Sequence, residues 1–158
     1  AAYSLSKIDR NDGEQIYPPH FDRRHNLNLT ATYTFGKGKN YEVSGRWNLG
    51  SGFPFTRTQS FYEEVNFNNG INTNYTNNNG NLGILYEEEL NQGRLPYYHR
   101  LDFSLKATYA LSVNTTLDIR ASVTNAYNRN NIFYFDRVRY ERVDQLPILP
   151  SLGVSLSF

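Results

Sequence analysis

The feature that most constrains the fold of this chain is an alternation of apolar and polar residues with a strict period of two. From Asn26 to Phe35, every second residue is apolar and the residues between them are Asn or Thr. Because successive side chains of a β-strand point to opposite faces, the pattern predicts a strand with one apolar and one polar face. The same pattern recurs in further segments, of which the first is short: 1–5, 41–49, 100–109, 117–124 and 152–158.

The links between these segments alternate between short and long. Short links cover 36–40, which is rich in glycine, and 111–114, whereas the long links cover about 9–22, 58–95 and 136–146. Tight turns join antiparallel neighbours, and apolar stripes of helical period are hard to find. The sequence therefore predicts an all-β, antiparallel fold of about six strands, without a domain boundary inside 1–158.

Composition excludes several classes of function. The formal net charge is +1, so no basic field favours nucleic acid as a partner. Cysteine is absent, which excludes disulfides and thiolate chemistry. No Ser-His-Asp arrangement or phosphate-binding loop can be placed, and the carboxylates of the polar faces show no sign of an acid–base pair. We expect the chain not to be an enzyme and to use no cofactor.

Two folds account for the alternation. One is a soluble β-sandwich, for example a carbohydrate-binding module, whose polar face meets water. The other is a segment of a transmembrane β-barrel. Run length favours the barrel, because about nine to eleven residues cross a bilayer as a tilted strand, whereas globular strands average about five or six. Short turns on one side and long loops on the other are also typical of outer-membrane barrels.

The positions of the aromatic residues, which make up 15% of the chain, also favour the barrel. Amphipathic rings collect at the headgroup level of a membrane, whereas a soluble core places its largest side chains in mid-strand. The residues predicted to form an aromatic girdle beside the short turns are Tyr33, Phe35, Tyr41, Tyr109 and Phe158. Trp47 lies nearer the long links, and we expect it in a second band with Tyr97, Tyr98 or Tyr127.

Charged residues within the runs fall on the polar faces alone, as Arg46, Asp102, Lys106, Asp118 and Arg120 show. A charge that faces lipid near the midplane costs about 2–4 kcal/mol. The residues expected to face lipid are Leu27, Leu29, Val43, Leu105, Ile119 and Val154. Those expected to face a lumen are Thr30, Arg46, Lys106 and Arg120.

Six strands are too few to close a membrane barrel, since the smallest single-chain barrels use about eight. Unpaired strand edges are not tolerated in hydrocarbon. We therefore expect both outer strands, 1–5 and 152–158, to pair with the rest of a barrel or with another barrel protein. Residues 1–6 lack the basic and apolar regions of a secretory signal peptide, so we expect a mature chain, a cytosolic chain or a fragment, and a C-terminal fragment agrees with the incomplete barrel.

Five motifs resemble the late barrel strands of TonB-dependent outer-membrane receptors, in the order of that family. Asp22 and His25 match its Asp-x-x-His, and 51–56 (SGFPFT) matches its Ser-Gly-x-Pro-aromatic-Thr. The segment 95–102 is similar to its Pro-x-Tyr-x-Arg-x-Asp, 125–128 (NAYN) to its Asn-x-aromatic-Asn, and 149–153 to its final strand entry. The matches span roughly residues 20 to 158.

The resemblance implies the last six strands of a 22-strand barrel in the outer membrane of a Gram-negative bacterium. It implies uptake of a nutrient such as a metal chelate or a glycan, energised by the TonB complex through a plug domain. We find no plug and no TonB-box candidate in the sequence, so the expected partners are the rest of the barrel, the lipid bilayer and, through the plug, the TonB complex.

The last residues resemble the β-signal that the barrel-assembly machinery recognises. The segment 151–158 (SLGVSLSF) is polar-x-Gly-x-x-apolar-x-aromatic, and its defining residues are Gly153, Leu156 and Phe158. The alternative is a final strand that merely ends on Phe. A barrel fragment held as a client by assembly machinery is therefore a further functional hypothesis.

The long links supply the candidate ligand contacts. The loop aromatics with the best claim to substrate contact are Phe61, Tyr62, Phe67 and Tyr75, and the Asn-rich stretch 66–81 around them suits a sugar or simply a solvated lid. Neither His20, Asp22 and His25 nor the carboxylates at 63–64 and 87–89 make a convincing metal site. We expect Asp22 and His25 to bond to backbone or to neighbouring strands.

Overall fold

The computed structural model describes residues 1–64 and 81–158. These residues contain strands and no helix that could cross a membrane. They divide into two compact units, and the first comprises 1–7, 23–52 and 95–158. The second comprises 8–22 and 53–94, of which 65–80 are outside the described residues.

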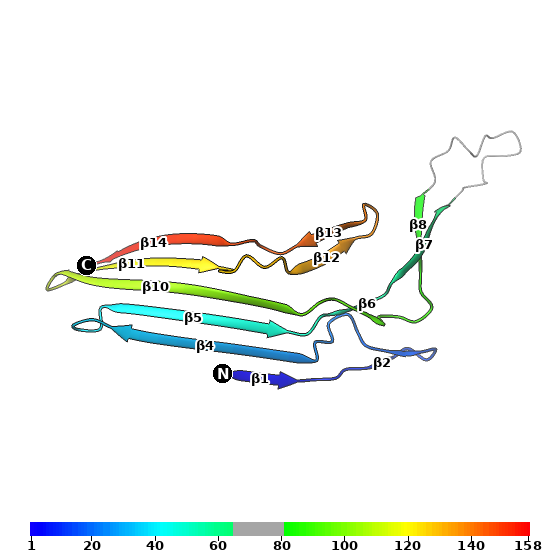
Figure 1. Cartoon of the computed structure of the whole chain (residues 1–158), viewed down its shortest axis with the longest axis horizontal. Coiled ribbons are helices and arrows are strands. Elements are labelled where there is room, and N and C mark those ends of the chain that lie inside the picture. The colour runs from blue at the N-terminus through cyan, green and yellow to red at the C-terminus, as the bar shows by residue number, and fades with distance from the viewer. Residues whose placement is uncertain (65–80) are drawn as a thin grey trace, which may run out of the picture. The chain divides into compact units, whose positions relative to one another are not determined.

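The first unit is built on one antiparallel sheet of six strands. In chain order these strands are β1 (Ala2–Leu5), β4 (His25–Phe35), β5 (Tyr41–Gly50), β10 (Tyr98–Ser112), β11 (Thr115–Thr124) and β14 (Leu149–Ser157). Their order in the sheet is also their order in the chain, with β1 and β14 at the edges (Figure 1). The prediction of an all-β, antiparallel fold of about six strands is confirmed.

The strands follow the alternating runs closely, and the exceptions have local causes. The strand β10 is longer than its run, because Tyr98 pairs with Gly50 and His99 with Leu49 at its beginning. At its other end the register shifts between Ala110 and Ser112, which is a β-bulge next to the turn. Leu111 is the extra residue of this bulge, and pairing with β11 resumes after it at Ser112.

The register joins the faces of the separate strands into two continuous surfaces. On one surface, Tyr33 pairs with Val43, Val43 with Leu105, and Leu105 with Ala121. On the other, a row of hydroxyl residues crosses five strands through Thr32, Ser44, Ser104, Ser122 and Ser151. We call the first the apolar face and the second the polar face. Residues predicted for opposite faces do lie on opposite faces, as the register of Leu105 and Lys106 shows.

The two short turns and the C-terminus lie at one end of the sheet, which we call the turn end (Figure 1). In the turn between β4 and β5, Gly36 and Gly38 have φ values of +94° and +93°, which are unfavourable for residues with a Cβ. A Cβ on Gly36 would also lie 2.9 Å from the ring of Tyr41. Glycine in this link is therefore required by the turn and by the ring beside it.

The long links contain small hairpins, which the alternation pattern did not reveal. In the first unit, β12 (Ile132–Asp136) pairs with β13 (Glu141–Asp144). The second unit consists of three such pairs. These are β2 (Arg10–Asn11) with β3 (Ile16–Tyr17), β6 (Pro54–Phe55) with β9 (Gly93–Arg94), and β7 (Thr58–Glu64) with β8 (Asn81–Tyr86). The expectation that these segments are loops is therefore incomplete.

The described residues contain no buried hydrophobic core. On the apolar face, Leu105 is 44% exposed, Leu152 75% and Val154 64%. The buried polar side chains instead belong to Asp22, Ser51, Asn125 and Asn131, where strands meet the long links. Burial of apolar surface is the main driving force of folding in water, and within the described residues the apolar face of this sheet stays uncovered.

Candidate functional site

The apolar face carries a cluster of aromatic rings at its turn end. The ring centroids of Tyr33 and Phe35 lie 5.9 Å apart, those of Phe35 and Tyr41 5.4 Å, and those of Tyr41 and Tyr109 6.3 Å. The hydroxyls of Tyr41 and Tyr109 are 3.4 Å apart. Four of the five predicted girdle residues thus form one chain of contacts across β4, β5 and β10. The fifth, Phe158, follows β14 and is 97% exposed.

A second aromatic cluster lies at the opposite end of the same face. The ring centroids of Trp47 and His99 are 6.4 Å apart, and those of His99 and Tyr127 are 5.4 Å apart. Nδ1 of His99 lies 2.6 Å from the hydroxyl of Tyr127. Of the three tyrosines expected near Trp47, Tyr127 belongs to this cluster through His99. The ring of Tyr98 instead lies under the guanidinium of Arg23, with 5.4 Å between the ring centroid and Cζ of Arg23. Burial of this guanidinium lowers the pKa of Arg23.

The polar face carries charges that pair with one another. Nε and Nη2 of Arg100 donate to Oδ2 of Asp102 at 3.1 and 2.9 Å. Nζ of Lys106 lies 3.2 Å from Oδ2 of Asp118, whose Oδ1 accepts a 2.5 Å hydrogen bond from the hydroxyl of Thr108. Asp102 and Asp118 are each held by a cation, and Asp118 also by a hydroxyl, so these two carboxylates belong to a paired polar surface.

Small hydroxyls occupy the row of the polar face described above. The hydroxyls of Ser44 and Ser104 lie 2.7 Å apart, and those of Ser122 and Ser151 lie 2.6 Å apart. These pairs satisfy each other between neighbouring strands, as cross-strand hydroxyl pairs commonly do. The row leaves a shallow polar band between the charged positions on either side of it.

The family-like motifs mostly occupy structural positions at the link end of the sheet. Oγ of Ser51 accepts the backbone N–H of His25 at 3.1 Å. A Cβ on Gly52 would lie 1.5 Å from the carbonyl oxygen of Leu95, so only glycine fits there. Nδ1 of His25 lies 2.9 Å from the hydroxyl of Tyr3 on the neighbouring strand. His25 thus contacts a neighbouring strand, which is the expected arrangement.

Asn125 organises the connection that follows β11. It is fully buried and has a φ of +55°. Asparagine adopts this left-handed backbone conformation more readily than β-branched residues do. Its Nδ2 donates to the carbonyls of Arg129 and Leu146 at 2.9 and 3.1 Å, and its Oδ1 accepts the N–H of Arg129 at 3.0 Å. Its own N–H donates to Oδ1 of Asp102. Asn125 therefore ties this turn to β10 through its backbone N–H and to the link before β14 through its side chain.

Asn131 extends this network toward the hairpin of β12 and β13. Its Oδ1 accepts the N–H of His99 at 3.2 Å, and its Nδ2 donates to the carbonyl of His99 at 2.9 Å. The amide thereby pairs with β10 as a backbone peptide would. Its carbonyl accepts the N–H of Gln145 at 2.8 Å. The segments before β12 and after β13 are thus fixed relative to β10.

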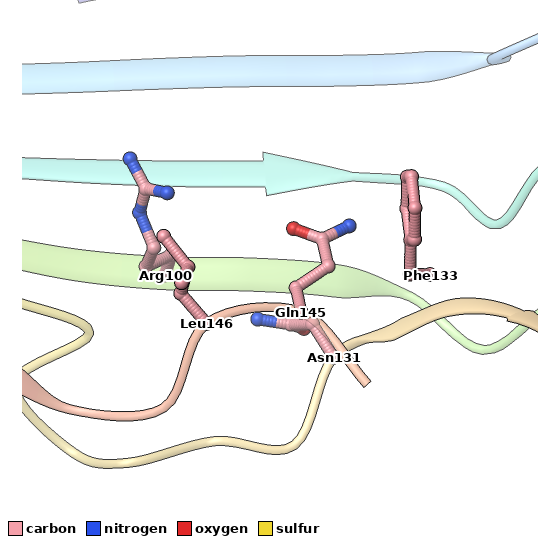
Figure 2. Close-up of a pocket in the computed structure, with 5 residues that line it drawn as sticks. All are labelled: Arg100, Asn131, Phe133, Gln145 and Leu146. Atoms are coloured by element: carbon pink, nitrogen blue, oxygen red, sulfur yellow. The ribbon is translucent and has the colours of Figure 1, made fainter. Parts of the chain in front are cut away.

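These segments enclose an open pocket of about 370 Å³ in the first unit (Figure 2). It is lined by Arg100, Asn131, Phe133, Gln145 and Leu146. Sequence patterns did not single out this pocket. Its residues come from β10, β12 and two irregular segments, and only Arg100 belongs to an alternating run, so no local pattern connects them.

The second unit is fastened by a buried ion pair. The carboxylate of Asp22 is fully buried, and Nη2 of Arg94 lies 2.5 Å from its Oδ2. Nη1 of Arg94 donates to the carbonyl of Asp22, and Oδ1 of Asp22 accepts the N–H of Ile8. Asp22 therefore bonds to backbone, as expected. The N–H of Asp22 donates to the carbonyl of Pro19 at 2.9 Å and so closes the turn at residues 20 and 21.

Two of the four candidate substrate contacts are described. Phe61 and Tyr62 lie within β7, where they pair with Ile84 and Gly83, rather than at a loop tip. A Cβ on Gly83 would lie 2.3 Å from the ring of Tyr62, so this ring covers the backbone of β8. Tyr62 remains 54% exposed. Phe67 and Tyr75 lie outside the described residues.

The β-signal residues lie on a free edge. Gly153 pairs with Arg120 and Leu156 with Leu117, so the inner edge of β14 is occupied by β11. The other edge has no partner strand within the described part of the chain. A Cβ on Gly153 would meet no atom within 4 Å, so no contact in this structure explains the glycine.

Among residues 1–64 and 81–158, no three His, Asp or Glu side chains gather closely enough to hold a metal ion. A scan against protein-family models finds no match, and searches of curated proteins and of solved structures find none either.

Proposed function

We propose that this chain is the C-terminal barrel portion of a TonB-dependent receptor in the outer membrane of a Gram-negative bacterium. Its six-stranded sheet spans the bilayer, with the apolar face toward lipid and the polar face toward the lumen. The remainder of the barrel pairs with its two edges. In the complete receptor, a plug coupled to the TonB complex releases a nutrient, such as a glycan or a metal chelate, through this lumen.

The observation that carries the proposal is the uncovered apolar face. The register brings apolar residues of all six strands onto one surface, and charges such as Arg46, Lys106 and Arg120 onto the other. A soluble sandwich would cover the apolar surface with a second layer. In the described residues it stays exposed, with Leu152 at 75% and Val154 at 64%. Lipid is the environment in which such a face is stable.

The two aromatic clusters support the same arrangement. Trp47 lies six residue positions after Tyr41, and Leu49, the partner of His99, lies eight positions after it. At about 3.3 Å per residue these separations are roughly 20–26 Å along the strand. The apolar band of outer-membrane barrels is about 25 Å tall and is bordered by aromatic girdles. The clusters thus lie where the two membrane interfaces would be.

Site-directed spin labelling tests the orientation of the sheet. The chain has no native cysteine, so a single introduced cysteine carries the only label. Labels at Val43, Leu105 and Ile119 are expected to collide with oxygen dissolved in lipid, because their side chains share the apolar face. Labels at Ser44, Lys106 and Arg120 are expected to collide with a water-soluble nickel chelate instead. Equal accessibility at adjacent positions would contradict the proposal.

Removal of Phe158 tests the assembly signal. Because the outer edge of β14 has no partner strand within the described residues and Phe158 is 97% exposed, an assembly factor can pair with the strand and receive the ring of Phe158. Deletion of Phe158 in the complete receptor is expected to lower its outer-membrane level severalfold, with little change in the unfolding temperature of the molecules that do insert. Leu29→Ala serves as the control. Normal insertion without Phe158, or an equal loss in the control, would show that Phe158 is an ordinary strand residue.

A further inference from the structure

The pocket beside the β12–β13 hairpin combines a rigid wall, formed by Asn131, with the side-chain amide of Gln145, which is available for hydrogen bonds. Asn131 is 5% exposed, and both the oxygen and the nitrogen of its side-chain amide bond to the backbone of His99. These two bonds hold this wall of the pocket in place. Gln145 is held through its backbone N–H on Asn131, and its side-chain amide makes no hydrogen bond within the described residues. In Figure 2 the guanidinium of Arg100 and the amide of Gln145 extend to the same side, with the ring of Phe133 beyond them.

A β-bulge sets the direction of the aromatic ring. In the β12–β13 pairing, Ile132 is opposite Asp144 and Tyr134 is opposite Val143, so Phe133 has no partner in the register. Bulges of this kind redirect a side chain and are common next to binding sites. The ring of Phe133 remains 65% exposed while lining the pocket. It makes one T-shaped contact with the ring of Tyr134, at 5.4 Å between centroids, and the rest of its surface can contact a ligand.

The charge of the pocket is balanced. Arg100 provides the only cation of the lining, and two of its nitrogens already donate to Oδ2 of Asp102. Its Nη1 makes no hydrogen bond within the described residues and can donate to a ligand oxygen. The other lining residues, Asn131, Phe133, Gln145 and Leu146, carry no charge. An anionic ligand would find no net positive charge here, whereas a neutral ligand rich in hydroxyls would find donors and acceptors.

We propose that this pocket binds one sugar unit of a neutral glycan. The C–H bonds on one side of a sugar ring pack on the negatively polarised face of Phe133. Its hydroxyls bond to the amide of Gln145 and to Nη1 of Arg100. The volume of about 370 Å³ lies within the ~300–1,000 Å³ of small-ligand pockets. The inference rests on the proposed function, because it selects a neutral glycan over an anionic metal chelate as the nutrient.

The test uses the complete receptor, of which the proposed function makes this chain a part, in detergent micelles. A panel of neutral oligosaccharides, covering α- and β-linked glucose, galactose and mannose, is titrated alongside an oligogalacturonate and ferric citrate. Binding is followed by calorimetry and by the NMR signal of the Gln145 side-chain amide. At least one neutral oligosaccharide is expected to shift this signal and to bind more tightly than both anionic probes.

Phe133→Ala is expected to weaken that binding about tenfold, through loss of the stacking surface. Phe135→Ala, on the same strand but outside the pocket lining, is the matched control and is expected to bind as the parent does. Gln145→Leu keeps a side chain of similar size and is expected to weaken binding without affecting the fold.

Three outcomes overturn the inference: no neutral sugar shifts the Gln145 amide, an anionic probe binds best, or Phe135→Ala weakens binding as much as Phe133→Ala. The spin-label experiment reports on the proposed function separately. If the labels show alternating lipid accessibility but no sugar binds, only the inference about the pocket is wrong. If a neutral sugar binds but the labels show no lipid accessibility, the membrane proposal is wrong and the inference about the pocket stands.

Discussion

Under the proposed function, Leu105→Arg is expected to destabilise the sheet by about 2–4 kcal/mol, which is roughly a 30- to 1,000-fold change in the folding equilibrium. Leu105 is the middle residue of β10, the longest strand, and lies between Val43 and Ala121 on the apolar face. In the proposed orientation, a guanidinium at this point would face the middle of the hydrocarbon, where little water can solvate it. The cost should therefore be near the maximum for any single position of the sheet.

Trp47, the only tryptophan of this chain, contributes to the signal for this measurement. Folding of the complete receptor into lipid vesicles is followed by tryptophan fluorescence at increasing urea, and the free energy is extrapolated to water. Ser104→Arg is the control, because Ser104 is the neighbouring residue on the polar face. It is expected to lose its 2.7 Å hydrogen bond to Ser44, at a cost of about 1 kcal/mol. If both variants lose stability equally, the two faces do not differ in environment and the membrane proposal is wrong.

Arg94→Ala is expected to lower the local stability of the second unit by about 3 kcal/mol. The carboxylate of Asp22 is fully buried and would lose the guanidinium now 2.5 Å from it. Breaking a buried ion pair costs about 3–5 kcal/mol, because the remaining charge is left in a poorly solvating environment. The lower value applies here since the side chain of Arg94 is 31% exposed.

Hydrogen exchange of the Leu90 and Asn91 amides reports on this local stability. Both amides are bonded inside the second unit, to Gln15 and Thr56 respectively. The double variant Asp22→Asn with Arg94→Gln removes both charges and is expected to recover about half of the loss, so the two sites should not be additive. Additive effects in the two single variants and the double variant would mean that the ion pair does not hold the second unit together.

The sequence predicted the six-stranded sheet well because a strand has the shortest possible period. Each alternating run carries its own signal within about ten residues, so β4, β5 and β11 could be located without knowledge of their neighbours. The short turns were found for the same reason, since glycine at 36 and 38 marks the positive φ that the turn needs. The aromatic clusters followed once the strand ends were known.

The hairpins of the long links and the pocket could not be predicted in this way. Strands of two to seven residues, such as β2, β6 and β7, are too short for a period to stand out from chance. Asp22 and Arg94 are far apart in the sequence, and nothing local marks them as partners. The direction of the Phe133 side chain depends on the β-bulge in β12. The bulge in turn depends on the register with β13, which the sequence of β12 alone does not specify.

The sequence by itself determined which residues form the sheet strands and which side chains share a face, because both follow from the backbone of a single strand. Only the tertiary structure decided that the faces of six strands join in register, that their apolar surface is left uncovered, and that Asp22, Asn125 and Asn131 are buried at the strand ends. These properties arise from pairings between distant segments. The free energy of such a pairing belongs to both partners, so neither segment alone contains the information that specifies it.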